Sequence, residues 1–189
     1  MGNREALIDG AKKCLNEKGY TRTTARDVAT ASGVSLAAIG YHFGSKDALL
    51  QAALFEAMQE WGEDLGRAFA TDIDPDATPA ERFEARWRRV IDSFGRHRPF
   101  WLMQFEMVAQ AEHVPELRKT LAAGVEAGRR GLAELFDSDA ELGALYQVLL
   151  SGVLMQWLID PATAPTAKEL GGSLGKLSGY LAAGPAGPA

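Results

Sequence analysis

The stretch that decides the fold is TTARDVATASGVSLAAIGYHFGSKDALL, residues 23–50. Thr24 precedes an acidic residue by three positions, which is the spacing of a capping box at the start of a helix. Gly33 suits the left-handed position that ends such a helix, and Ser35 can cap the next one. Two short helices joined by a tight turn predict a helix-turn-helix over about residues 24–43.

Helical periodicity continues on both sides of this stretch. One helix is expected before it, from about Arg4 to Lys18, and a long one after it, capped by Ser45. No window alternates with the period of a strand. Further helices are expected from Thr78 to the Arg98-Pro99 break, from Phe100 to Ala111, from Pro115 to Phe136, over about 141–159 and over 167–183. The sequence therefore predicts an all-α fold of about nine helices.

The charge of the chain is distributed unevenly. The 189 residues carry a formal net charge of −5. Residues 1–50 hold seven basic and five acidic side chains, a net charge of +2, whereas the remainder holds thirteen against twenty, a net charge of −7. An excess of positive charge at one end is expected where that end meets phosphate and the other end does not.

The helix-turn-helix divides into packing residues and outward-facing residues. The apolar positions Val28, Ala29, Val34, Ile39 and Phe43 are expected to pack inward. This leaves six residues on or near the outer face: Ser35, Leu36, Ala37, Ala38, Tyr41 and His42. Tyrosine and histidine can donate hydrogen bonds to phosphate, and Lys46 in the following first helical turn suits a nearby anion. Each of these residues, taken alone, is equally compatible with an ordinary surface.

Taken together, the segments 23–29, 33–35 and 41–50 resemble the signature of the TetR family of regulators. The resemblance implies a homodimer whose recognition helices, about Ser35 to His42, enter successive major grooves of a palindromic operator. The half-sites would then lie roughly 34–36 Å apart. The function it implies is a transcriptional regulator, expected to be a repressor that a small, largely apolar ligand releases from DNA.

The resemblance also assigns roles to residues of the head. Thr24, Tyr41, His42 and Lys46 match positions that commonly hold phosphates, and Ser35, Leu36, Ala37 and Ala38 match positions that face bases. Arg26 is a further candidate DNA contact. Gly40 stands where bulky residues are common, and no arginine, asparagine or glutamine is placed to read a base edge bidentately. We therefore expect phosphate contacts and DNA shape to carry much of the affinity.

Residues beyond the head supply a candidate ligand site. Large apolar and amide side chains can line a cavity and orient a ligand in it. The candidates are Trp61, Phe94, Trp101, Gln104, Phe105, Gln147 and Trp157. An ordinary core filled by aromatic side chains is the alternative for each of them.

The segment Leu142 to Ile159 is uncharged over eighteen residues. It is short for a membrane span, contains polar side chains and lacks basic flanks, so no membrane partner is expected. With the leucine stripe of the last helix it predicts a homodimer interface through about 141–159 and 167–183. Packing within one chain is the alternative.

The expected organisation is a DNA-binding domain over 1–50, a ligand-binding and dimerisation domain over 51–183, and a disordered tail over 184–189. The single cysteine, Cys14, and the absence of a signal peptide indicate the cytoplasm. No cofactor, metal site or enzymatic activity is expected, since the sequence carries no phosphate loop, nucleophile elbow or metal-ligand helix. The alternative function is a helical ligand-binding or protein-interaction module that does not bind DNA specifically.

Overall fold

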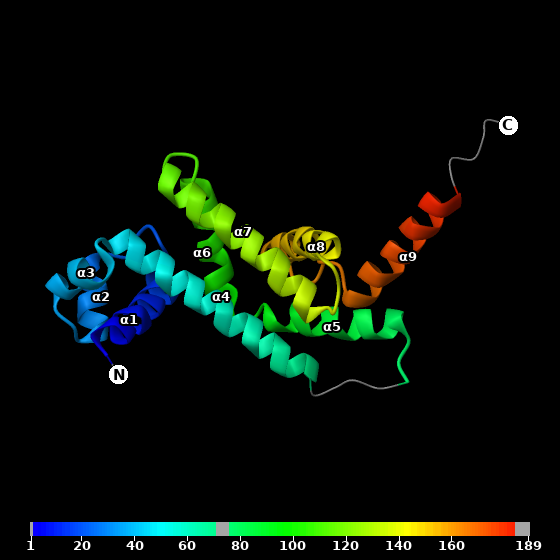
Figure 1. The fold of residues 1–189 in the computed structure, drawn as a ribbon, viewed down its shortest axis with the longest axis horizontal. Helices are drawn as coiled ribbons and strands as arrows, with labels where there is room; N and C mark the ends of the chain where they lie inside the picture. Colours follow the sequence, from blue (N-terminus) through cyan, green and yellow to red (C-terminus); the bar gives the residue numbers. More distant parts are fainter. Residues whose placement is uncertain (1, 71–75, 184–189) are drawn as a thin grey trace. The chain divides into compact units, whose positions relative to one another are not determined.

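The computed structural model describes residues 2–70 and 76–183, and over these residues it holds nine helices and no strand (Figure 1). The predicted all-α fold is confirmed. The tail expected over 184–189 lies outside the described residues. The helices are α1 (Asn3–Lys18), α2 (Ala25–Ser32), α3 (Leu36–Phe43), α4 (Lys46–Ala70), α5 (Pro79–Ser93), α6 (Arg98–Gln110), α7 (Pro115–Leu135), α8 (Ala140–Ile159) and α9 (Ala167–Ala183).

The chain divides into two compact units. The first unit comprises Met1–Asp64 and Arg96–Arg130, and the second comprises Leu65–Gly95 and Gly131–Ala189. The long helices α4 and α7 each contribute to both units. The first unit therefore contains α6 as well as the head, by which we mean α1 to α3 and the start of α4.

Close packing of α1 against α2 organises the head. A Cβ atom added at Gly10 would lie 2.9 Å from the backbone nitrogen of Ser32, so only glycine permits this approach. The fully buried side chains Leu7, Val28 and Leu49 come from three different helices of the head. Because α3 packs against α1 and α2, the head fixes the orientation of α3 with its own residues.

The caps of the short helices decide where they begin. Thr24 forms the expected capping box, in which its Oγ1 accepts from the Asp27 backbone nitrogen at 3.2 Å. Gly33 ends α2 with a left-handed φ of 68°. Ser35 is the N-cap of α3 but makes no side-chain capping bond, so the expected role of its hydroxyl is wrong. That hydroxyl is exposed and not used in capping.

The start of α6 differs from the expectation. The sequence predicts a break at Arg98-Pro99 and a helix from Phe100, but α6 begins at Arg98 and includes Pro99 in its first turn. A proline is tolerated there because the first-turn N–H groups have no intrahelical acceptor. The helix therefore carries two more residues at its start than periodicity predicts.

Aromatic side chains dominate the core of the second unit. Phe136 lies 5.7 Å from Trp87 and 4.4 Å from Tyr146, measured between ring centroids. Phe69 and Phe83 extend the cluster to α4 and α5. These five side chains, which we call the aromatic cluster, come from α4, α5, α8 and the residue after α7. The cluster therefore joins segments that are far apart in sequence.

Candidate DNA-binding surface and ligand sites

Helix α3 presents its outer face to solvent. Tyr41 is 85% exposed and Leu36 is 47% exposed, whereas Ile39 on the opposite face is buried. Ser35 and Ala37 are exposed, and Ala38 is half-buried. A helix with small residues and one protruding tyrosine can approach a groove closely without a steric barrier.

Two aromatic contacts order the end of α3. The rings of Tyr41 and His42 meet edge to face with centroids 4.9 Å apart. The Arg4 guanidinium of α1 lies 5.4 Å from the centroid of the Phe43 ring. His42 is half-buried, so Tyr41 is the more accessible of the two predicted phosphate donors.

The start of α2 is held by an ion pair as well as by its cap. Lys18 Nζ lies 2.6 Å from Asp27 Oδ1, and the Thr24 backbone nitrogen donates to Asp27 Oδ2 at 2.9 Å. The hydrogen bond from Lys18, followed by those from Thr24, lowers the pKa of Asp27 to about 2. The Thr24 hydroxyl also lies 2.8 Å from Asp27 Oδ2. Thr24 is thus engaged in capping, while Arg26 in the same turn is exposed.

Lys46 sits at the first position of α4 above the turn that joins α1 to α2. Its Nζ donates to the Thr23 carbonyl at 3.3 Å and lies 3.2 Å from Asp47 Oδ1. The same ammonium lies 5.8 Å from the centroid of the Tyr20 ring. Its side chain remains 31% exposed, so part of it is in contact with solvent.

The structure therefore places all nine predicted DNA-contact residues in the head. All of them except Lys46 belong to α2, α3 and their N-caps, and their roles on DNA stay predictions. Sequence reasoning missed Tyr20 and Glu106, which lie beside this surface. The Tyr20 backbone nitrogen donates to Glu106 Oε2 at 2.8 Å across 86 positions of sequence. No periodic signal links residues at that separation.

The predicted ligand residues of the first unit are Trp61, Trp101, Gln104 and Phe105. Trp61 of α4 and Trp101 of α6 are buried and meet edge to face with ring centroids 4.9 Å apart. Gln104 and Phe105 are half-buried. The tryptophan pair joins α4 to α6, which is the arrangement of a core contact.

The remaining predicted ligand residues, Phe94, Gln147 and Trp157, belong to the second unit. Phe94 and Trp157 meet with ring centroids 5.7 Å apart. Gln147 is half-buried, and its Oε1 is buried without a hydrogen-bond partner. Sequence reasoning missed Trp87, which is 0% exposed and whose Nε1 is also buried without a partner. Unsatisfied buried polar atoms are rare and call for an explanation.

A cavity of about 190 Å³ lies in the first unit between α1, α4 and the start of α6. Lys12 on its wall donates to Glu56 and Glu60 at 2.9 and 2.8 Å. Burial opposes the charge of Lys12, but these hydrogen bonds raise its pKa above the ordinary value. Burial lowers the pKa of His97 on the same wall. None of the seven predicted ligand residues lines this cavity.

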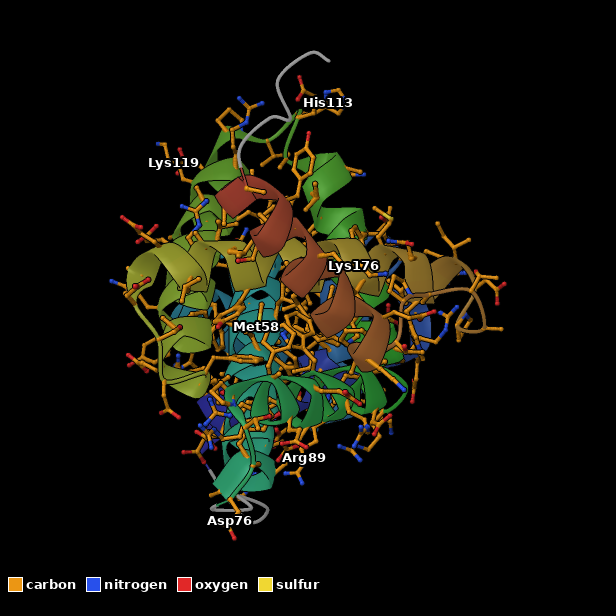
Figure 2. All side chains as sticks on the ribbon, turned by 90° about the vertical axis from the view of Figure 1, so that its right-hand side faces the viewer. Met58, Asp76, Arg89, His113, Lys119 and Lys176 are labelled. Atoms are coloured by element: carbon orange, nitrogen blue, oxygen red, sulfur yellow. The ribbon has the colours of Figure 1, made fainter. Side chains whose placement is uncertain are left out.

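Helices α8 and α9 expose an apolar surface. Val148 and Ile159 on α8 are 67% and 78% exposed, and Leu181 on α9 is 70% exposed. Only 22% of the most apolar window of α8 is buried, and by length and composition this helix could also cross a membrane. Figure 2 shows α9, marked by Lys176, on the side of the second unit that faces the viewer. Exposed apolar surfaces of this kind are typical of interaction sites.

Two protein families match the chain. Residues 7–53 match the family described as bacterial regulatory proteins, tetR family. Residues 78–177 match the family described as tetracyclin repressor-like, C-terminal domain, which spans more than half of the chain.

Curated relatives agree with these matches. The chain is 27% identical over 172 residues to the HTH-type transcriptional regulator TtgR of Pseudomonas putida, covering 84% of this chain and 81% of TtgR. It is 35% identical over 82 residues to the HTH-type transcriptional regulator BetI of Brucella anthropi, covering 43% of this chain and 40% of BetI.

Solved structures extend the similarity to the whole fold. The multidrug binding protein EbrR, complexed with imidazole, superposes with a TM-score of 0.70 at 26% identity and covers 92% of this chain and 95% of its own. A TetR-family member from Streptomyces coelicolor A3 gives 0.68 at 25% identity, with 94% and 98% coverage. The structure of EbrR complexed with proflavin superposes with a TM-score of 0.63 at 25% identity. It covers 93% of this chain and 99% of its own.

Proposed function

The chain belongs to the TetR family of bacterial transcriptional regulators, and we propose that it acts as a homodimeric repressor whose heads bind a palindromic operator and which a small aromatic ligand releases. The observation that carries this proposal is the exposed outer face of α3, with Tyr41 85% exposed, followed by the partly exposed Lys46 at the start of α4. Donors at these positions suit phosphate oxygens.

The chemistry of α3 favours binding through phosphate and shape. Leu36 and Ala37 can contact thymine methyl groups, and the Ser35 hydroxyl is not used in capping. Tyr41, His42 and Lys46 supply the donors that fix the head on the backbone. Arg26 and Thr24 lie on the neighbouring helix and extend the polar surface. We infer a modest sequence preference and a strong dependence of affinity on salt.

A second copy of the chain is the proposed partner of α8 and α9. The exposed side chains Leu145, Val148, Met155 and Ile159 recur along the face of α8 opposite to its buried residues. Pairing with the same surface of a second copy would remove these side chains from water and form a four-helix bundle. A lipid bilayer is the alternative partner of the same surface. Sedimentation distinguishes the two: a dimer forms without vesicles, whereas a membrane-binding protein sediments with them.

The proposed effector site lies in the second unit, at the aromatic cluster. Trp87 Nε1 lacks an acceptor and Gln147 Oε1 lacks a donor. A planar aromatic ligand with one acceptor can stack on these rings and satisfy the Trp87 donor. For release of DNA, the ligand must bind the conformation with low DNA affinity more tightly than the other.

The first experiment measures binding of duplexes from the protein's own upstream region by electrophoretic mobility shift. Wild type is compared with the Tyr41→Ala/Lys46→Ala double variant, with Lys119→Ala, an exposed lysine of α7, as a matched control. Loss of two charge-assisted contacts predicts an affinity about a hundredfold lower for the double variant and unchanged for the control. Equal binding by all three proteins contradicts the proposed surface.

The effector site is tested with quinoline and naphthalene, which differ by one ring nitrogen. Wild type should bind quinoline about fivefold more tightly, since only quinoline accepts a hydrogen bond. Trp87→Phe keeps an aromatic ring and removes the donor, so it should bind the two probes equally. Titration calorimetry measures both affinities. A preference for quinoline that survives in Trp87→Phe rejects this donor.

A further inference from the structure

Glu106 of α6 contacts the head at a point the proposed DNA surface does not include. Its Oε2 accepts a hydrogen bond from the Tyr20 backbone nitrogen at 2.8 Å. A Cβ atom added at Gly19 would lie 3.3 Å from the same oxygen, and Gly19 has a φ of 78°. The carboxylate is therefore packed against the start of the turn that joins α1 to α2.

Lys46 packs against this turn. Tyr20 is 8% exposed, the Lys46 ammonium lies over its ring, and the Thr23 carbonyl accepts a hydrogen bond from Lys46 Nζ. The Tyr20 hydroxyl donates to Asp47 Oδ1 at 3.4 Å, so the ring is held at its far end as well. Burial and then the neighbouring Asp47 raise the pKa of Tyr20 to about 12, which keeps this donor protonated.

We propose that Glu106 is a positioning residue for DNA binding. It holds the turn between α1 and α2 in the position from which the Lys46 ammonium contacts a phosphate. The inference rests on the proposed DNA-binding function and adds a residue outside the helix-turn-helix to it. Because Glu106 belongs to α6, its hydrogen bond to Tyr20 joins that helix to the turn against which Lys46 packs. The contact thereby links α6 to the DNA-binding surface within the first unit.

Electrostatics alone predicts the opposite effect, which makes the inference testable. Removing a carboxylate near a phosphate-binding surface strengthens DNA binding through simple charge repulsion. Loss of the Tyr20 contact weakens it, since the turn is released. Glu106→Ala removes both the charge and the acceptor, whereas Glu106→Gln removes the charge and keeps an acceptor oxygen.

The experiment compares wild type, Glu106→Ala, Glu106→Gln and the charge control Glu112→Ala on an operator duplex selected by wild type from a random pool. Glu112 is exposed and pairs with Arg118 just beyond α6. We expect Glu106→Ala to bind about fivefold more weakly and to show a salt dependence reduced by about one phosphate contact. Glu106→Gln and Glu112→Ala should bind as tightly as wild type or more tightly.

Hydrogen exchange of the Tyr20 amide gives a second readout on the free protein. The amide should exchange faster in Glu106→Ala and at the wild-type rate in Glu106→Gln. Two results would overturn the positioning role of Glu106 and leave the proposed DNA binding intact. In the first, Glu106→Ala binds the operator as tightly as wild type. In the second, Glu106→Gln weakens binding as much as Glu106→Ala does. Failure of wild type to select any duplex overturns the proposed function, and this inference with it.

Discussion

The head and the α8–α9 surface differ in how far their apolar residues are buried. In the head, Leu7 and Val28 are 0% exposed, and the large apolar residues left outside are Leu36 and Tyr41 on the proposed DNA face. On α8 and α9, apolar side chains such as Val148 and Leu181 remain mostly exposed. The head thus buries most of its apolar side chains by itself, whereas α8 and α9 leave theirs exposed, as the proposed dimer interface requires.

This difference is the reason why we propose DNA as the partner of the head and a second copy of the chain as the partner of α8 and α9. A closed core fixes the donors of the head rigidly, which suits a polyanion whose phosphate spacing is constant. An open apolar surface gains free energy mainly by excluding water, and a second copy offers the same surface for this purpose. Substitutions in the two regions should therefore change different measurements.

The largest effect is expected in the core of the head. Leu7→Ala should lower the free energy of unfolding by about 3 kcal/mol, since Leu7 is fully buried and its removal leaves a cavity. Val148→Ala on α8 should change the unfolding of the monomer by less than about 0.5 kcal/mol. Urea denaturation at a protein concentration below that of dimerisation measures both. If both variants lose the same free energy of unfolding, the head and the α8–α9 surface do not differ in burial as described.

The next effect is expected on assembly. Val148→Arg should raise the dimer dissociation constant about a hundredfold, because it places an unpaired charge in a desolvated interface. Analytical ultracentrifugation measures the change. Gln110→Arg, which adds the same charge at an exposed position of α6, is the control and should leave the dimer intact. A Val148→Arg protein that remains dimeric would place the interface elsewhere.

A smaller effect separates phosphate contacts from base contacts in the head. Tyr41→Phe should weaken operator and random duplexes alike by about fivefold, since the hydroxyl donates to phosphate. Leu36→Ala should weaken only the operator, since an apolar side chain contacts base edges. Fluorescence anisotropy with the two duplexes distinguishes them. A selective loss in Tyr41→Phe would assign that residue to base recognition.

The smallest effect is expected from pH. The pKa of Asp27 is lowered from 3.8 to about 2 in the folded protein, so its carboxylate stabilises the fold above the unfolded pKa. This contribution is lost as pH falls from about 4 through 2. The stability difference between wild type and Asp27→Asn should be constant from pH 7 to 5 and shrink towards pH 3. Chemical denaturation across this range measures it, with Asp92→Asn as the control.

Local signals in the sequence are sufficient for the helices and for the head. Capping and glycine positions place α2 correctly because Thr24 and Gly33 act on their own backbone neighbours. The same reasoning fails at Ser35, whose hydroxyl makes no capping bond, and at Pro99, which the first turn of α6 accommodates. Caps and breaks are thus predictable in position more than in detailed geometry.

The candidate ligand residues show the limit of local reasoning. Size alone favours Trp61 and Trp101, which pack against each other in the first unit. Phe94 and Trp157 form a separate pair in the second unit. Trp87 is not among the sequence candidates, although its Nε1 is buried and unsatisfied in the same way as Oε1 of the candidate Gln147. Burial and hydrogen-bond satisfaction depend on every neighbour, and periodicity does not report them.

The sequence by itself determined the helical architecture, the position of the reading head and its family, because each rests on short-range spacing and backbone preferences. The tertiary structure alone decided which polar atoms are left unsatisfied, which apolar faces stay open, and that Glu106 meets Tyr20. These features arise where segments distant in sequence pack together. Contacts between such segments produce no periodic pattern in the sequence, so the sequence does not predict them.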